Sequence, residues 1–342
     1  MHLHALHRFK VPSFIPEVGS IPLPELTAHI PTVSPDVLSR LLNHAVGNYI
    51  LIRPEPGHIA HSAVSAMLAA SPEMQDWLGS ACEDIWPAAS QVVPALVKWP
   101  RSVEPHQTGL NLMGRTEEPF FTILSHDPDR EKRFASAMSI MKGVPGFQPS
   151  AALEAYDWGA LGEAVVVDVG GSKGDFALAL TEMYPKLSVI VQDVPVVVDE
   201  GRSMLPERVG PAITFQGHNF FETQPVQGAD VYFFRMILHD WPDEYCLRIL
   251  RNLVPALKPG ARVIINDRCV PPTEEMSHYE ARQTRSQDIA MMAVFNSKER
   301  SEVEWRSLIS RADSRFHFES IVQLKPSPLA VMELSWRPLG ST

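Results

Sequence analysis

The chain has 342 residues, of which 45% are hydrophobic and 20% are charged, so its composition is that of a globular protein large enough for two domains. Its net charge of -10 and its lack of a Lys/Arg cluster argue against a nucleic-acid partner. No apolar run reaches the roughly 18 residues of a transmembrane helix, so we expect no membrane partner. The three widely spaced cysteines indicate reduced thiols in a cytoplasmic protein.

The first part of the chain has a helical pattern. Residues 34–51, "SPDVLSRLLNHAVGNYIL", begin with Ser34 as a helix N-cap, and residues 72–99 form a second, longer helical run. Between them, residues 51–62, "LIRPEPGHIAHS", have the pattern of a two-stranded wing around a Pro/Gly turn. A shorter helical stretch, residues 23–30 "LPELTAHI", precedes residue 34. Two helices followed by a wing suggest a winged-helix module, and we assign residues 1–150 to a helical, winged-helix-like domain.

The pattern changes near residue 160, where strands begin to alternate with helices as in a parallel sheet with crossover connections. Four near-continuous apolar segments fit strands that are buried on both faces. They are 164–169 "AVVVDV", 187–193 "LSVIVQD", 229–240 "ADVYFFRMILHD" and 261–268 "ARVIINDR". We therefore predict that residues 151–342 form an α/β domain with a Rossmann-like sheet.

Each of these strands ends in polar residues. They are Asp168, Asp193, Arg235, His239, Asp240 and Asp267. Any one of them could be a helix N-cap or a solvated strand end. Because ligands of open α/β sheets bind beyond the carboxyl ends of the strands, we expect these side chains to meet at one crevice.

Residues 165–180, "VVVDVGGSKGDFALAL", run from the first strand through a glycine turn into a helix. The glycines are Gly170, Gly171 and Gly174. They allow a close backbone approach, and the helix N-terminus favours an electron-rich ligand. Asp193 follows about twenty residues later, where a carboxylate can accept both hydroxyls of a ribose. Lys173 is the single basic residue near the turn, so a nucleoside with a zwitterionic tail, such as S-adenosylmethionine, fits better than NAD.

The last apolar run, residues 316–336, has two strand-like halves around a turn at 325–328. A terminal hairpin after alternating units places an antiparallel strand in the sheet. This order favours a methyltransferase over a dehydrogenase.

Three segments, in this order, resemble the plant and fungal small-molecule O-methyltransferases of the caffeic-acid type. They are 166–177 "VVDVGGSKGDFA", 233–268 "FFRMILHDWPDEYCLRILRNLVPALKPGARVIINDR" and 295–305 "FNSKERSEVEW". The resemblance extends less sharply over nearly all of the chain. It implies an S-adenosylmethionine-dependent enzyme that acts on a small hydroxylated secondary metabolite. His239 would be the general base, with Asp267 and Glu299 as its flanking acids.

The same resemblance assigns the binding residues. The cofactor side would consist of Gly170, Gly171, Gly174, Asp193, Asn219, Phe220 and Arg235. Asn219 stands where the family usually has an Asp for the adenine amine, so it can accept a hydrogen bond but brings no charge. The acceptor side would consist of Asn111, Met138, Met141 and Asp240. The two methionines are either core residues or the lining of an apolar, irregular acceptor pocket.

The family also implies a homodimer built by N-terminal helices, and the first domain would form a substrate lid. Almost none of that dimerisation segment precedes residues 11–26, "VPSFIPEVGSIPLPEL". We expect either a weaker dimer or a truncated gene model.

The chemistry fits these residue types. A phenol with a pKa of about 10 is a poor nucleophile until a base takes its proton, and histidine is suited to that task. We expect no metal, because His58 and His61 lie in the predicted wing and no cluster has metal-ligand spacing.

Three other interpretations compete with this one. His239 could be a capping or core histidine before a helix. The chain could be a pericyclase or cyclase on the same fold, which uses the sulfonium only as a fixed charge, with Lys298, Gln287 and His126 serving the cyclisation. It could also be a winged-helix regulator, although its acidic charge counts against that.

Overall fold

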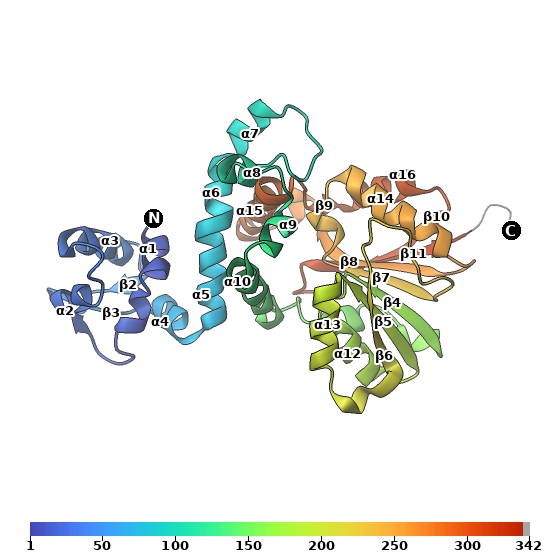
Figure 1. The fold of residues 1–342 in the computed structure, drawn as a ribbon, viewed down its shortest axis with the longest axis horizontal. Coiled ribbons are helices and arrows are strands. Elements are labelled where there is room, and N and C mark those ends of the chain that lie inside the picture. Colours follow the sequence, from blue (N-terminus) through green and yellow to red (C-terminus); the bar gives the residue numbers. More distant parts are fainter. Residues whose placement is uncertain (338–342) are drawn as a thin grey trace. The chain divides into compact units, whose positions relative to one another are not determined.

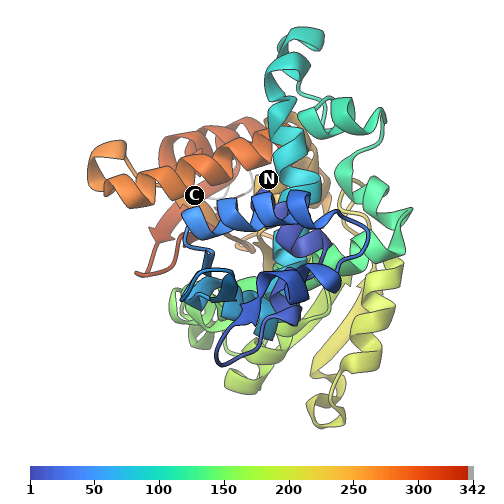
Figure 2. The same ribbon diagram turned by 90° about the vertical axis from the view of Figure 1, so that its left-hand side faces the viewer.

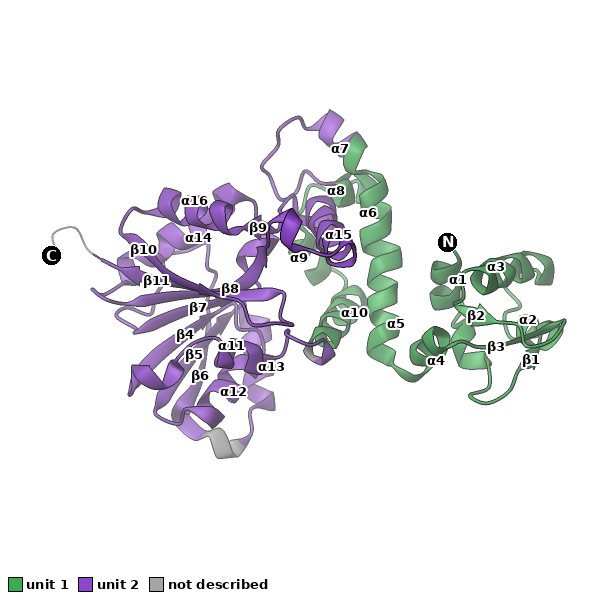
Figure 3. Cartoon of the chain, turned by 180° about the vertical axis from the view of Figure 1, so that it is seen from behind, with its two compact units in different colours: residues 1–93, 109–141 green, residues 94–108, 142–342 purple. Residues whose placement is uncertain are grey.

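The computed structural model describes residues 1–337, apart from the side chains of residues 142 and 207–209. The chain divides into two compact units (Figure 3). Unit 1 comprises residues 1–93 and 109–141, and unit 2 comprises residues 94–108 and 142–342. The division falls near the predicted boundary at residue 150, except that residues 94–108 group with unit 2. Residues 338–342 of the predicted second domain lie outside the described residues.

The N-terminal half of unit 1 combines three helices with a small antiparallel sheet, seen in blue in Figure 2. The helices are α1 (His2–Arg8), α2 (Leu23–Ala28) and α3 (Pro35–Gly47), and the strands are β1 (Ile21–Pro22), β2 (Leu51–Ile52) and β3 (His58–His61). Strands β2 and β3 form the predicted wing, and β1 adds a third strand beside β3. Ser34 caps α3 as predicted, since its hydroxyl accepts a hydrogen bond from the Val37 N–H at 3.4 Å.

The second half of unit 1 is helical. Its helices are α4 (Ala63–Ala70), α5 (Pro72–Ser80), α6 (Trp86–Ser90), α8 (Gly109–Gly114), α9 (Phe120–Ser125) and α10 (Pro128–Ser139), and α7 (Val92–Lys98) spans the boundary between the units. The run predicted to be helical over residues 72–99 is helical, but it is divided between α5, α6 and α7. A π-helical turn, Ala81–Ile85, separates α5 from α6, and the helix is interrupted again before α7. Pro87 and Pro94 follow these two interruptions, and a proline cannot donate to the preceding turn.

Unit 2 contains a mixed sheet in the order β10-β11-β8-β7-β4-β5-β6 (Figure 1). The strands are β4 (Ala164–Val169), β5 (Leu187–Asp193), β6 (Ile213–Gly217), β7 (Val231–Arg235), β8 (Arg262–Val270), β10 (Phe316–Val322) and β11 (Leu329–Trp336), and β9 (Arg300–Ser301) pairs with β8. Strands β4 to β8 are parallel to their neighbours, whereas the predicted terminal hairpin inserts β11 antiparallel to β8. The strand predicted for 229–240 ends at Arg235, because Met236 adopts a positive φ of 55°.

Helices cover both faces of this sheet. One face packs against α14 (Asp243–Leu253) and α16 (Glu302–Ala312), and the other packs against α11 (Pro149–Glu154) and α12 (Asp175–Met183). The remaining helices of unit 2 are α13 (Pro195–Met204) and α15 (His278–Phe295). This arrangement is the predicted Rossmann-like α/β fold, and it explains why the strands are apolar on both faces. Among the helices within residues 1–337, none has both the length and the apolar character needed to span a bilayer.

Candidate active site

The glycine turn connects β4 to α12 and leaves no room for side chains. The N–H groups of Gly170 and Gly171 both donate to the carbonyl of Gln192 on β5, at 2.8 and 3.0 Å. A Cβ on Gly170, whose φ is 73°, would lie 2.4 Å from the Ile237 side chain. A Cβ on Gly171 would lie 2.6 Å from the carboxyl group of Asp168. Both glycines are therefore required by close packing at the ends of β4 and β7.

Asp168, at the end of β4, is a buried acid with one oxygen that lacks a hydrogen-bond partner within residues 1–337. The residue is 1% exposed, and its Oδ2 atom has no hydrogen-bond partner among the described residues. Burial raises the pKa of Asp168 to about 7, against the opposing charge of Arg235. An oxygen left without a donor in this position is costly unless a ligand supplies one.

Asp193, at the end of β5, has a second role beyond the predicted one. Its Oδ2 accepts a hydrogen bond from the Ser172 N–H at 2.9 Å, and its Oδ1 accepts one from the Val194 N–H at 2.8 Å. Burial raises the pKa of Asp193, and these two hydrogen bonds oppose the rise. The acid predicted to hold a ribose therefore also holds the glycine turn in place, at a residue, Ser172, whose φ is 52°.

A pair of buried amides, which the sequence did not lead us to expect, joins the end of β5 to the loop after β6. The side chains of Gln192 and Gln224 exchange hydrogen bonds at 2.9 and 2.8 Å, and Gln192 also donates to Gln216 at 2.8 Å. The single indication in the sequence was a glutamine inside the otherwise apolar run before Asp193. The pair attaches the loop after β6 to the end of β5.

The loop after β6 and the end of β7 carry the other predicted cofactor residues. Asn219 is exposed, and its side-chain oxygen accepts the Phe221 N–H at 3.0 Å. Phe220 is partly buried and packs against the core between the sheet and helices α14 and α16. Arg235 donates to Asn266 at 3.0 Å and to the carbonyl of Phe147 at 2.5 Å. A local hydrogen bond thus fixes the side chain of Asn219, and long-range hydrogen bonds fix that of Arg235.

His239 lies on a short 3-10 turn, Leu238–Asp240, that follows β7. Its Nδ1 atom is 3.5 Å from Glu299 Oε1 and 4.0 Å from Asp267 Oδ1, and its Nε2 atom is 3.5 Å from Asp240 Oδ1. Asp267 also accepts the backbone N–H of His239 at 3.2 Å and that of Arg268 at 3.0 Å. The fold therefore brings the three predicted catalytic residues together, and it adds Asp240 on the other side of the ring.

The electrostatics of this cluster favour a charged imidazole. Burial alone would lower the pKa of His239, but Asp240, Asp267 and Glu299 outweigh it and raise the pKa to about 10. Burial raises the pKa of Asp240 to about 6, against the opposing charge of His239, and burial also raises the pKa of Asp267. The Arg268 Nε atom lies 3.5 Å from Glu299 Oε1 and partly balances the acidic charge.

The remaining predicted acceptor residues belong to unit 1. Asn111 on α8 is buried, and its amide donates to the carbonyls of Thr116 and Glu118 at 3.3 and 2.7 Å. Met138 on α10 is 38% exposed, and Met141 is partly buried in the following turn. Their part in acceptor binding stays a prediction, and Asn111 has a structural task within its own unit.

The residues considered for a cyclisation are engaged elsewhere or lie outside the His239 cluster. Lys298 forms ion pairs with Glu304 at 2.9 Å and with Asp243 at 3.6 Å. Gln287 lies on α15, and His126 of unit 1 lies 3.2 Å from a carboxylate oxygen of Glu118. In the part of the chain that the structure describes, the His239 ring contacts the carboxylates of Asp240, Asp267 and Glu299, and it forms no hydrogen bond or ion pair with Lys298 or Gln287.

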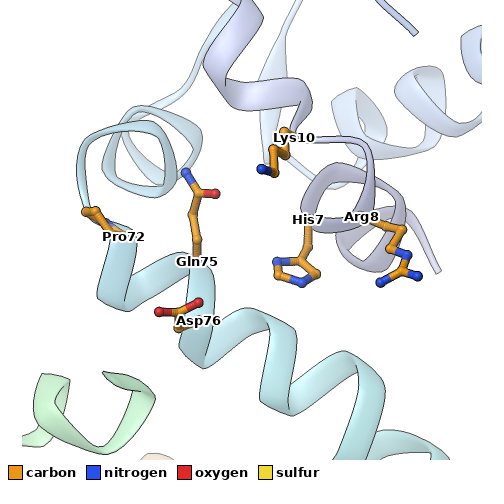
Figure 4. A pocket seen from close by; sticks show the side chains of 6 residues that line it. All are labelled: His7, Arg8, Lys10, Pro72, Gln75 and Asp76. Carbon is orange, nitrogen blue, oxygen red and sulfur yellow. The ribbon is translucent and has the colours of Figure 1, made fainter. Parts of the chain in front are cut away.

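A pocket of about 360 Å³ lies in unit 1 between α1 and α5 (Figure 4). It is lined by His7, Arg8, Lys10, Pro72, Gln75 and Asp76. It contains none of the predicted catalytic, cofactor or acceptor residues. In residues 1–337, no group of three or more His, Cys, Asp and Glu side chains is arranged to hold a metal ion.

Comparison with known proteins identifies the family of the chain. Residues 105–315 match the family model of the O-methyltransferase domain. The chain is 38% identical to the O-methyltransferase aoiF of Aspergillus oryzae, over 96% of this chain and 79% of that protein. It is 36% identical to the chlorophenol O-methyltransferase of Trichoderma longibrachiatum, over 98% of this chain and 73% of that protein.

Solved structures show the same fold. The structure of LepI in complex with S-adenosylmethionine aligns with a TM-score of 0.76 and 29% identity, over 98% of this chain and 86% of that one. A structure described as a pericyclic reaction enzyme aligns with a TM-score of 0.75 and 27% identity, over the same shares. The matched domain and the relatives together establish that the chain belongs to the O-methyltransferase family of enzymes.

Proposed function

We propose that this protein transfers the methyl group of S-adenosylmethionine to a phenolic or enolic hydroxyl of a small secondary metabolite, with His239 as the general base. The observation that carries the proposal is the orientation of the His239 ring. Nδ1 faces the carboxylates of Glu299 and Asp267, whereas Nε2 lies on the side of Asp240. A ring held through Nδ1 presents Nε2 to an acceptor, and there the proton of the acceptor would be shared with the neighbouring carboxylate of Asp240.

The strand ends of unit 2 fit the cofactor. The glycine turn excludes side chains, Asp193 lies beside it, and the unpartnered Oδ2 of Asp168 is an acceptor for a cationic group. We expect Asp168, Asp193 and Arg235 to hold the zwitterionic and ribose parts of the ligand. S-adenosylmethionine supplies a methyl carbon on a sulfonium, and the electrons of the broken C–S bond leave with the sulfur.

The cofactor assignment is tested with Asp193→Asn, which keeps one acceptor oxygen but removes the charge. We expect S-adenosylhomocysteine to bind about 5- to 150-fold more weakly, because hydroxyls that bonded the carboxylate lose a strong partner. Asp199→Asn is the matched control, since Asp199 is exposed and pairs locally with Arg202. Unchanged affinity in Asp193→Asn, measured by titration calorimetry, would contradict the assignment.

The proton step follows from the charge around the ring. Nε2 of His239 takes the hydroxyl proton while the acceptor oxygen attacks the methyl carbon, and Glu299 and Asp267 stabilise the imidazolium that forms. The raised pKa of His239, about 10, is close to that of a phenol, so the proton transfer is nearly balanced in energy. With this pKa the ring of the free protein is already protonated at neutral pH, so only a small fraction of the protein can accept a proton.

The base is tested with His239→Gln, using methyl-labelled S-adenosylmethionine and a chlorophenol as the acceptor. We expect methyl transfer to fall by about 10² to 10⁴-fold while S-adenosylhomocysteine binding survives. His317→Gln is the control, because His317 is an exposed histidine on β10. A His239→Gln variant that retains the full rate would rule out His239 as the base.

A second candidate is a pericyclase or cyclase that uses the bound sulfonium as a fixed charge. It is favoured by the alignment with LepI and with the structure described as a pericyclic reaction enzyme. The two functions differ in methyl consumption. Product formed without S-adenosylhomocysteine would establish the second candidate, and one equivalent of S-adenosylhomocysteine per product would establish the first.

A further inference from the structure

A buried arginine forms hydrogen bonds to the backbone on either side of His239. Arg300 is 1% exposed, and its guanidinium donates to the carbonyls of Leu238 and Trp241, each at 2.9 Å. The same group donates to Asp243 Oδ1 at 3.0 Å from Nε and 2.9 Å from Nη2. Asp243 begins helix α14, so one planar cation joins the His239 turn to the helix that follows it.

Ser297, three residues before Arg300, contacts the carbonyl of His239, to which Arg300 does not donate. Its hydroxyl lies 2.5 Å from the carbonyl oxygen of His239 and 2.9 Å from that of Trp241. The carbonyls of Leu238, His239 and Trp241 are thus all within hydrogen-bond distance of side chains from residues 297–300. Between these two residues lies Glu299, whose carboxylate faces the imidazole ring.

The position of residues 297–300 is itself fixed. The Glu299 N–H donates to Asp288 Oδ1 at 2.9 Å, and Arg300 pairs with Cys269 of β8 in the β8–β9 ladder. The Arg300 guanidinium also lies 5.1 Å from the centre of the Trp305 ring, whose N–H donates to the carbonyl of Arg268 at 3.0 Å. The segment is therefore anchored to the strand that carries Asp267.

We propose that Arg300 and Ser297 are positioning residues for the base: they fix the backbone of His239 while Glu299 fixes its ring. The proposal rests on the proposed function of His239. A buried guanidinium is costly unless its donors are used, and here they are shared between the carbonyls of Leu238 and Trp241, on either side of His239, and the carboxylate of Asp243. A displacement of the ring by about 1 Å is enough to reduce the rate of a proton transfer strongly.

The test is Arg300→Lys, which keeps the charge but cannot span two carbonyls and a carboxylate with one planar group. We expect kcat for methyl transfer to a chlorophenol to fall by about 10- to 100-fold, with unchanged affinity for S-adenosylhomocysteine. Arg311→Lys is the matched control, because Arg311 also contacts Asp243, at 3.4 Å, but it pairs with Asp243 and Glu244 rather than with the carbonyls around His239. Its activity should equal that of the wild type.

A second readout does not depend on the reaction. The imidazole resonances of His239, assigned by their loss in His239→Gln, should move in Arg300→Lys and, to a smaller extent, in Ser297→Ala. Ser297→Ala removes one hydroxyl and serves if Arg300→Lys does not fold. Unmoved resonances together with an unchanged kcat would overturn the positioning role. Full methyl transfer by His239→Gln alongside moved resonances would instead overturn the proposed function, and would show that Arg300 and Ser297 position His239 but not a catalytic base.

Discussion

The substitution Glu299→Gln removes one charge from the His239 cluster with little change in shape. Glu299 Oε1 lies 3.5 Å from Nδ1 of the ring, and its side chain is 1% exposed. At an effective dielectric constant of about 20, two unit charges at this distance interact by about 5 kcal/mol, which is an upper limit. Asp240 and Asp267 remain in the variant, beside the cations Arg268 and Arg300. We therefore expect the pKa of His239 to fall by roughly 1 to 2 units.

The assay is the pH dependence of kcat/KM for a chlorophenol at saturating S-adenosylmethionine. Because the free protein holds His239 with a pKa of about 10, the wild-type value should rise about tenfold per pH unit between pH 7 and pH 9. In Glu299→Gln the rise should begin at lower pH. Its plateau should be about 10- to 100-fold lower, since the ring and its imidazolium lose a partner.

The control is Glu302→Gln, in which the acid is about half exposed and pairs with Arg306. It should reproduce the wild-type profile. A lower plateau at an unshifted midpoint in Glu299→Gln would mean that Glu299 does not act on the charge of the ring. A flat wild-type profile from pH 6 to pH 9 would refute the raised pKa itself.

Asp168→Asn neutralises a buried carboxylate whose Oδ2 atom lacks a hydrogen-bond partner among the described residues, so the free protein should unfold at higher temperature above pH 7, while S-adenosylmethionine binds more weakly. Lower thermal stability of the variant above pH 7 would contradict this. Gly170→Ala should abolish cofactor binding because of the contact with Ile237, whereas Gly228→Ala, at a similar φ of 72° but in open space, should cost only about 1 to 2 kcal/mol of unfolding free energy. Because folding raises the pKa of His239 above its unfolded value, its contribution to stability should be complete below about pH 6 and lost as the pH rises towards 10, which thermal melts of wild type and His239→Gln can compare.

Much of the fold follows from the local pattern of the sequence. Strands β4 and β5 begin and end where the apolar runs begin and end, because a strand buried on both faces needs side chains such as Val167 and Val191 at successive positions. Strand β11 of the terminal hairpin is buried on both faces in the same way, whereas β10 alternates between buried and exposed positions at the sheet edge. Strand β6 was missed, because Thr214 and Gln216 interrupt its apolar pattern at the edge of the sheet.

Other boundaries depend on conformations that composition does not reveal. The sequence of residues 229–240 reads as one strand, yet the chain turns at Met236, where the N–H donates to the carbonyl of Asn266 on the neighbouring strand. That turn is what places His239 on a separate 3-10 element beside Asp267 rather than within β7. A long-range contact between strands, not a local preference, decides this position.

By itself the sequence determined which residue types stand at the ends of the strands, because hydrophobic periodicity and the glycine turn are local and can be read along the chain. It thereby placed His239 and Asp267 at strand ends, whereas the choice of His239, Asp267 and Glu299 as a catalytic set came from the resemblance to the O-methyltransferases. Only the tertiary structure decided how these groups face one another, since Glu299 is sixty residues from His239 and reaches it through the β8–β9 pairing. The tertiary structure also decided the raised pKa of His239 and the hydrogen bond from Arg300 to the carbonyl of Leu238. Burial and charge depend on neighbours that the chain brings together only when it folds.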